Sequence, residues 1–311
     1  MIVLQLAMLL CAASHARKDP PVGLSAWLDL REHRRISHDT YHMGRHAHPH
    51  RKHEFVTGYA FLNLHRSNAR TRPAATGKIH RDKHEHFKRN LTTHESLASH
   101  LTNRLLYASL PRCTGPIAEG AAWHRASGYY LHTLNRNGMS IGAIVDAVQR
   151  ANDAWECGLA NFERLVLGPL LGVVNATSGK VINTGEPDGV NEIGFAAIEG
   201  HDGTVAVTIV WGVLDGPLQD RGIVEFDMIF DGEHYRWGNA EFDNSVMDLQ
   251  AICTHETGHR LGLDDIYDPA CNDVTMYGTS SEGEIDKRSL AHSDLSGLSL
   301  LYGPLAQRAA P

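Results

Sequence analysis

Apolar residues beyond position 122 are grouped in runs whose lengths and spacing match those of strands and helices. Continuous or alternating apolar runs predict β-strands at 128–134, 173–181, 192–197, 205–211 and 223–230. The 205–211 run is almost wholly apolar, as in strands that are buried on both faces of a sheet.

Segments whose apolar residues have helical spacing lie between these strands and after them. Residues 141–155 carry apolar side chains on one helical face, and a second helical period covers 246–261, which Gly262 ends. A last helix is expected at 293–301. One strand, one helix, several strands and two further helices predict an α/β domain that is large enough for its own core.

The region before this domain, residues 17–112, has few apolar residues and many basic ones. It contains 13 of the 21 histidines and has a net charge of +10, whereas residues 113–311 have a net charge of −17. We predict a poorly ordered, basic, His-rich pro-segment or linker that the acidic domain attracts. Helical spacing occurs only at 93–110. The irregular histidine cluster at 42–53 favours a solvated polar tract over a metal site, and no nucleic-acid motif accompanies the basic residues.

The first sixteen residues resemble a secretory signal peptide. A short apolar run is followed by small residues, although no Lys or Arg precedes it. The run is too short to span a bilayer, so we expect a secreted, extracellular protein rather than an integral membrane protein. The expected organisation is a signal peptide at 1–16, the basic segment at 17–112, a folded domain at 113–305 and a tail at 306–311.

The segment with the clearest chemistry is Thr254-His255-Glu256-Thr257-Gly258-His259. Positions four apart lie on one face of a helix, so His255 and His259 can share one metal ion with Glu256 beside them. Gly262 allows the chain to turn back after the helix. Asp265, three residues later, supplies a carboxylate for the third ligand position, and Met276 follows in Val274-Thr275-Met276-Tyr277-Gly278.

At these residues the chain resembles the metzincin metallopeptidases. More narrowly it is similar to the matrixin-like secreted peptidases (the M10 type), including the snapalysin type, in which aspartate replaces a third histidine. The similarity covers about 248–303, continues more weakly upstream to Trp123, and includes none of 17–110. Its further matching residues are Asp265-x-Tyr267, Cys271, Lys287-Arg288-Ser289-Leu290, Asp294-Leu295-Ser296-Gly297 and Leu301-Tyr302-Gly303.

The resemblance implies a twisted mixed β-sheet with an active-site helix, a methionine turn and a C-terminal helix. It implies one catalytic Zn²⁺ held by His255, His259 and Asp265, with Glu256 as the general base. Met276 would pack under the metal without binding it. The activity implied is that of a zinc endopeptidase acting on proteins or peptides, which pair with an exposed edge strand, for which we take 205–211.

Three details of the metal sites stay open in the sequence. Asp264 is a rival third ligand, although the spacing from Gly262 favours Asp265. His201 and His234 lack the spacing of the second, structural zinc site that vertebrate matrixins have. Acidic loops suit Ca²⁺ but fix no site, the candidates being Asp188, Asp202 and Asp231.

Four cysteines follow the predicted signal peptide, and four cysteines allow three disulfide patterns. Pro111-Arg112-Cys113 is similar to the start of the matrixin pro-segment switch, in which a thiolate occupies the metal, but the next residues do not complete that motif. We favour the disulfides Cys113–Cys157 and Cys253–Cys271 over the switch.

Two other functions compete with a secreted, monomeric peptidase made as a precursor. One is a catalytically inactive secreted metal-binding protein that retains the fold, and the other is a His-rich metal scavenger. Glu256 argues against the first, because a purely structural metal site needs no general base.

Overall fold

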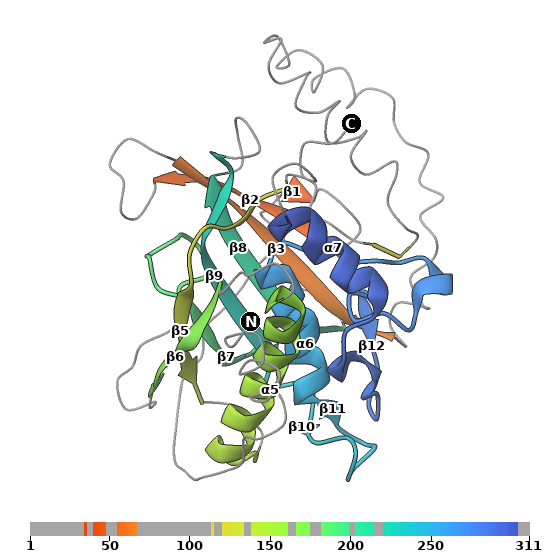
Figure 1. Ribbon diagram of the computed structural model, residues 1–311. Coiled ribbons are helices and arrows are strands. Elements are labelled where there is room, and N and C mark those ends of the chain that lie inside the picture. The colour runs from red at the N-terminus through yellow and green to blue at the C-terminus, as the bar shows by residue number, and fades with distance from the viewer. Residues whose placement is uncertain are drawn as a thin grey trace, which may run out of the picture.

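One large β-sheet with helices packed on one face forms the body of the protein (Figure 1). The computed structural model describes residues 34–35, 40–47, 55–66, 113–114, 120–133, 138–160, 166–174, 182–198, 203–213 and 220–303. The predicted signal peptide and the predicted helix at 93–110 lie outside the described residues. No helix among the described residues combines the length and apolar character that a membrane crossing needs.

Five strands make the centre of this sheet. They are β5 (Ser127–His132), β6 (Leu167–Val174), β7 (Glu192–Ala196), β8 (Thr204–Val213) and β9 (Gly222–Asp231). Their order is β6-β5-β7-β9-β8, with parallel pairing from β6 to β9 and antiparallel pairing between β9 and β8. The predicted mixed α/β fold is confirmed.

Strand β6 is the one central strand whose predicted position is wrong. It begins at Leu167, six residues before the predicted start, and the predicted end at 181 lies outside the described residues. The strand contains Pro169 and two glycines and ends the described sheet, where Leu171 is 55% exposed. An edge strand of this kind is half solvated and can contain proline, so it lacks the apolar run by which the other strands were found.

Three strands from the basic N-terminal region extend the sheet at its other side. They are β1 (Arg34–Arg35), β2 (Thr40–Ala47) and β3 (Phe55–His65). β1 pairs with β2, β2 with β3 and β3 with β8, and all three pairings are antiparallel. The prediction of a poorly ordered segment therefore does not extend to these strands. The interpretation of 205–211 as an exposed edge is wrong, because β3 covers that edge of β8 (Figure 1).

Four short strands complete the described pairing. β4 (Ala122–Trp123) pairs with β9, and β12 (Thr279–Ser280) runs parallel to the end of β3. β10 (Trp237–Gly238) and β11 (Met247–Asp248) form a separate two-stranded ladder.

The helices pack against one face of the sheet (Figure 1). They are α5 (Ile141–Ala160), α6 (Leu249–Arg260) and α7 (His292–Tyr302), with the 3₁₀ turns η5 (Pro269–Cys271) and η6 (Asp286–Arg288) between the last two. α6 starts three residues after the predicted position because β11 uses Met247 and Asp248, and Asp248 caps the helix.

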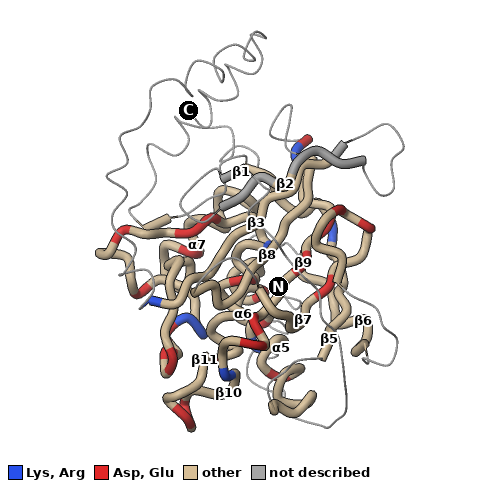
Figure 2. Tube along the Cα trace, turned by 180° about the vertical axis from the view of Figure 1, so that it is seen from behind, with Lys and Arg blue, Asp and Glu red and all other residues tan. Residues whose placement is uncertain are grey.

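Apolar residues form a core on each face of the sheet. The larger core lies between the sheet and the helices and includes Trp155 of α5, which is fully buried. The smaller core lies on the other face and joins Leu62 of β3 to Val207 and Ile209 of β8. Strand β3 is therefore packed from both sides. The charged positions that colour the trace are mostly acidic, in line with the negative charge of the catalytic region (Figure 2).

The disulfide pattern differs from the predicted one. Cys113 is bonded to Cys271, with their Cα atoms 5.4 Å apart, and Cys253 is a free, buried thiol on α6. Cys157 is also disulfide-bonded, but not to Cys113. Both favoured pairings are therefore wrong. With its sulfur in a disulfide, Cys113 also cannot act as a thiolate switch in this state.

Carboxylates are buried together on strands β7 and β9. Glu225 accepts hydrogen bonds from the backbone N–H groups of Asp188 and Gly189, and Glu192 lies opposite Asp227 in the ladder. Burial raises the pKa of Glu225 to about 7 even though the two hydrogen bonds lower it, and burial raises the pKa of Asp227 in the same direction. Each carboxyl therefore holds its proton more firmly in the folded chain than in the unfolded chain.

We expect Glu225 to make the fold more stable in mild acid. Its folded pKa lies above the unfolded value, so its contribution is complete below about pH 4.5 and is lost as the pH rises through about 7. The loss is up to roughly 3 kcal/mol. Urea unfolding of the wild type and of Glu225→Gln between pH 4 and 8 measures this loss. The free energy of unfolding should change less with pH in the variant than in the wild type. Equal changes with pH would contradict the prediction.

Candidate metal centre

Helix α6 carries the predicted metal motif and is fixed at both ends. At its start, Asp248 accepts hydrogen bonds from the N–H of Ala251 and from the guanidinium of Arg288. At its end, Gly262 has φ +100°, a left-handed conformation that favours glycine, and a Cβ there would lie 2.6 Å from the carbonyl oxygen of Ala121. The predicted role of Gly262 in turning the chain is confirmed.

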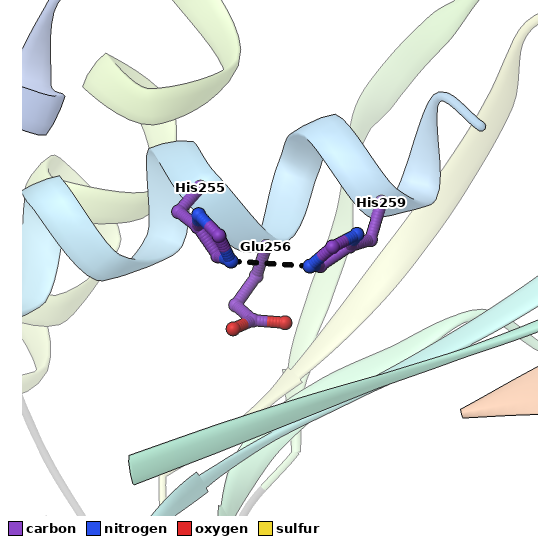
Figure 3. A group of neighbouring side chains, drawn as sticks. All are labelled: His255, Glu256 and His259. Carbon is purple, nitrogen blue, oxygen red and sulfur yellow. Dashed lines mark hydrogen bonds between the residues drawn. The ribbon is translucent and has the colours of Figure 1, made fainter. Parts of the chain in front are cut away.

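The two histidines and the glutamate point from α6 toward the sheet (Figure 3). All three side chains are fully buried. The Nε2 atoms of His255 and His259 are 3.1 Å apart, and the carboxylate of Glu256 completes a group of potential metal ligands. The helical spacing therefore brings these residues together as predicted.

The hydrogen bonds of the two Nδ1 atoms show where each imidazole carries a proton. The Nδ1 atom of His255 lies 2.8 Å from the carbonyl oxygen of Thr275, and that of His259 lies 2.8 Å from the carbonyl oxygen of Leu263. A carbonyl oxygen only accepts, so each Nδ1 carries a proton, and each ring directs the lone pair of Nε2 inward when that ring is neutral. Two such lone pairs at this separation repel each other unless a cation or a proton lies between them.

Asp265 lies beside the histidine pair. Its Oδ1 atom is 3.2 Å from Nε2 of His255 and 3.5 Å from Nε2 of His259, and its side chain is 2% exposed. The hydroxyl of Tyr267 donates to the other oxygen, Oδ2, at 3.2 Å. Asp264 instead accepts a hydrogen bond from the N–H of Asp265. Of the two aspartates, Asp265 is the one placed next to both imidazoles.

This arrangement fits a zinc ion. In a tetrahedral site with bonds of about 2.0–2.1 Å, neighbouring ligand atoms lie about 3.3 Å apart. The three distances among the two Nε2 atoms and Asp265 Oδ1 run from 3.1 to 3.5 Å. Two imidazoles and a carboxylate are also a common donor set for zinc, and the pair of inward lone pairs gives the chain itself a need for a cation there.

Glu256 has one bonded and one free oxygen. The hydroxyl of Thr208 on β8 donates to Oε2 at 2.6 Å, while Oε1 is buried without a hydrogen-bond partner. Burial raises the pKa of this carboxyl to about 7. An unpaired carboxylate oxygen next to the histidine pair can accept a proton from a reacting water.

The turn carrying Met276 lies directly against α6. A Cβ on Gly258 would overlap the Met276 sulfur and lie 2.9 Å from the ring of Trp155. Asp294 of α7 fixes this turn by accepting hydrogen bonds from the N–H groups of Thr275, Met276 and Ala291. Met276 is 1% exposed, and its sulfur packs on the helix.

The segment after Met276 is fixed by a buried lysine. Lys287 donates to the carbonyl oxygens of Tyr277 and Thr279 and to the hydroxyl of Ser280. Burial lowers its pKa to about 8. This cation therefore fixes strand β12, which follows the methionine turn at the metal centre.

Several residues of this centre were not found by sequence reasoning. Thr208 has no motif of its own that reveals its contact with Glu256, because the contact joins distant segments. Gly258 stands inside the metal motif, and Lys287 and Asp294 stand in segments that matched the family, but neither signal reveals the contacts of these residues. The hydrogen bonds of Asp294 to the methionine turn could not be inferred from that match.

The other predicted cation sites gain no support as sites. His234 is bonded to Asp231, whose carboxylate also accepts the N–H groups of Glu233 and His234. Asp188 accepts a hydrogen bond from the N–H of Val190. His201 and Asp202 lie outside the described residues. Calcium binding therefore stays a prediction.

The fold and this centre define a zinc metalloendopeptidase domain of the His-Glu-x-x-His type. Residues 187–303 match the Matrixin family, Peptidase M10, and so form a matrixin domain of the metzincin clan. No curated protein matches the chain. The matched stretch begins just before β7 and ends after α7, so it includes the whole centre described above.

We expect Gly258→Ala to damage this centre. Alanine favours a helix over glycine by about 1 kcal/mol, yet here the added Cβ has no space, and overpacking costs about 1–3 kcal/mol. The free energy of unfolding and the zinc affinity should both fall, as measured by urea unfolding and by zinc competition with a chelating dye.

Gly158→Ala on α5 is the matched control. Its Cβ would meet the ends of the Leu295, Leu298 and Leu290 side chains, at 2.9, 3.0 and 3.3 Å, and these can move. If Gly258→Ala bound zinc as tightly as Gly158→Ala, the contact with Met276 would not position the histidines.

Proposed function

We propose that the chain is a secreted zinc endopeptidase, made as a precursor, in which His255, His259 and Asp265 hold the ion and Glu256 is the general base. The observation that carries the proposal is the convergence of two inward-facing Nε2 atoms and one carboxylate oxygen within 3.1–3.5 Å, beside the unpaired oxygen of Glu256. A structural zinc site would need no such free carboxylate.

The ion would supply Lewis-acid polarisation of the scissile carbonyl and of the attacking water. The residues of the chain perform the proton transfers. Glu256 takes a proton from the water on its free oxygen, Oε1, as the water oxygen bonds to the carbonyl carbon. It then delivers that proton to the leaving nitrogen as the C–N bond breaks. Thr208 holds the other oxygen, Oε2, so that the carboxylate keeps one orientation through both transfers.

The proposal includes secretion of the protein and an extracellular site of action. They are supported by the signal-like start of the sequence and by the Cys113–Cys271 disulfide, since disulfides persist mainly in oxidising compartments. Proteins and peptides are the substrate class we expect, because the centre is that of a matrixin-type endopeptidase domain.

The test is zinc-dependent proteolysis by the full chain. We expect one zinc ion per chain and slow cleavage of a denatured protein, lost with a chelator and restored by zinc. Asp265→Ala should weaken zinc binding by at least tenfold, because one of three protein ligands is gone. Zinc bound at full stoichiometry with no cleavage would favour the alternative, an inactive metal-binding protein that retains the fold.

A further inference from the structure

A second pocket lies between α5, the segment from β10 to the start of α6, and η6. Its volume is about 390 Å³, at the lower end of the range of about 300–1,000 Å³ for small-molecule sites. Ala143 and Ala147 of α5 line one part of it, and Asp248 and Gln250 at the start of α6 line another. None of the described residues that line it is a proposed metal ligand or the general base. The pocket therefore serves no step of the proposed reaction.

The charged side chains of this pocket are paired with one another. Arg288 bonds both carboxylate oxygens of Asp248, at 2.9 and 2.6 Å, and one oxygen of Glu241, at 3.1 Å. Arg150 bonds Asp146 at 2.8 Å. A charged ligand would have to compete with these pairs, whereas a neutral polar ligand can form hydrogen bonds beside them.

Two side-chain amides add uncharged hydrogen-bonding groups to the pocket. The Oδ1 atom of Asn239 accepts from Arg288 at 2.6 Å and from the N–H of Glu241 at 3.0 Å, which leaves the NH₂ group of Asn239 for a ligand. The side-chain amide of Gln250 has no hydrogen-bond partner among the residues that the structure describes. The pocket can therefore both donate to and accept from a ligand without a change of charge.

The edge of the pocket carries the most exposed large apolar side chain of the described residues, Phe242, which is 84% exposed. A single exposed apolar residue is common, but the loop that carries this one is fixed. The N–H groups of Phe242 and Asp243 donate to the carbonyl oxygen of Asn239, and Asp243 is bonded to Arg236 and Ser245. The backbone under the ring is thus ordered before a ligand arrives, which lowers the entropy cost of binding.

An exposed aromatic face beside amides and paired charges suits a sugar ring. The C–H groups on the face of a pyranose pack on an aromatic ring, while its hydroxyls donate and accept hydrogen bonds at the edge. A wholly apolar ligand would instead bury the polar groups of the pocket without partners. Sugars with only equatorial substituents, such as β-linked glucose and N-acetylglucosamine, have the flattest apolar faces.

We propose that this pocket binds a neutral glycan of β-linked glucose or N-acetylglucosamine units. One sugar ring stacks on Phe242, and its hydroxyls bond to Asn239, Gln250 and the paired charges. The glycan would hold the protein on a polysaccharide or a glycoprotein without occupying the metal centre. The inference does not depend on the proposed peptidase activity.

The test is isothermal titration of the full chain with cellohexaose and with chitohexaose, in the Glu256→Gln background to prevent self-cleavage. A single pocket of this size should bind one of them with a Kd of about 0.1–1 mM. Phe242→Ala should weaken this binding by about tenfold or more because the aromatic contact is lost, and Phe242→Trp should retain it. Arg150→Met removes a donor from the pocket and should weaken binding by about three- to tenfold.

Leu171→Ala is the matched control. It removes another exposed apolar side chain, 55% accessible, from β6, and should bind the glycan as the wild type does. Heparin oligosaccharides, which are sulfated and need a basic site, should bind more weakly than the neutral glycans. Retention on insoluble chitin or cellulose, compared with binding to ovalbumin before and after removal of its N-glycans, distinguishes a polysaccharide from a glycoprotein as the source.

Three results would overturn the inference. They are no saturation by either oligosaccharide up to about 10 mM, binding that Phe242→Ala leaves unchanged, and tighter binding of heparin than of the neutral glycans. Saturable binding that is the same with and without zinc, and is lost in Phe242→Ala, would support the glycan site. If the wild type then hydrolysed no peptide, only the proposed function would be contradicted.

Discussion

Replacing Glu256 by Gln should lower kcat/KM for peptide hydrolysis by about 10²–10⁴-fold, the usual contribution of a positioned general base. The amide has the same shape but cannot take a proton from water at its free position. Thr208 can still donate a hydrogen bond to the amide oxygen, so the side chain should stay in place. The rate of hydrolysis of a fluorogenic peptide is compared between the zinc-loaded Glu256→Gln variant and the zinc-loaded wild type.

Zinc content is the control for this variant. His255, His259 and Asp265 are unchanged in Glu256→Gln, so the bound zinc per chain should equal that of the wild type. A variant that retained a tenth or more of the activity would show that another group accepts the proton. A variant that lost its zinc would show that Glu256 acts as a ligand, which the proposed mechanism does not allow.

Trp155→Ala should lower the free energy of unfolding by about 3–5 kcal/mol, the range for deleting a buried aromatic side chain. Trp155 is fully buried between α5 and α6, and its indole N–H donates to the carbonyl oxygen of Thr254 at 2.6 Å. The same ring borders Gly258, so its loss also opens space beneath the helix that carries the histidines. Urea unfolding with the disulfides intact measures the change.

Two further substitutions define what Trp155 contributes. Trp155→Phe keeps most of the ring volume and loses the hydrogen bond, so its cost should be clearly smaller than that of Trp155→Ala. Phe242→Ala removes an aromatic ring that is 84% exposed and should change stability by less than about 0.5 kcal/mol. Equal losses for Trp155→Ala and Phe242→Ala would mean that the α5–α6 contact does not determine stability.

The metal centre was the part of the structure most open to prediction, because its geometry is local. His255, Glu256 and His259 lie within two turns of one helix, so the helical repeat alone brings them together. Gly262 and Asp265 follow closely enough that a single turn decides where the carboxylate goes. The placement of Asp265 beside both imidazoles followed from this spacing.

Contacts between distant segments were less open to prediction. The run Phe55–His65 is apolar enough for a strand, but the surrounding histidines and arginines hid it, and its partner β8 lies some 140 residues away. The Cys113–Cys271 bond was missed for a similar reason, since residue spacing does not determine which cysteines pair, and Cys253 stays a free thiol instead of pairing as all three considered patterns require. The Gly258–Met276 contact depends on packing between α6 and a turn, which periodicity does not describe.

The Cys113–Cys271 bond closes residues 113–271 into one covalent ring, which contains the five central strands, α5, α6 and Asp265 but not the methionine turn or α7. The two cysteines are 158 residues apart, and closing a loop of that length removes chain entropy equivalent to about 5 kcal/mol from the unfolded state. That amount is a large share of the total stability of a typical domain. In a thiol-rich compartment the ring would open and much of this margin would be lost, so a reducing environment would itself inactivate the enzyme.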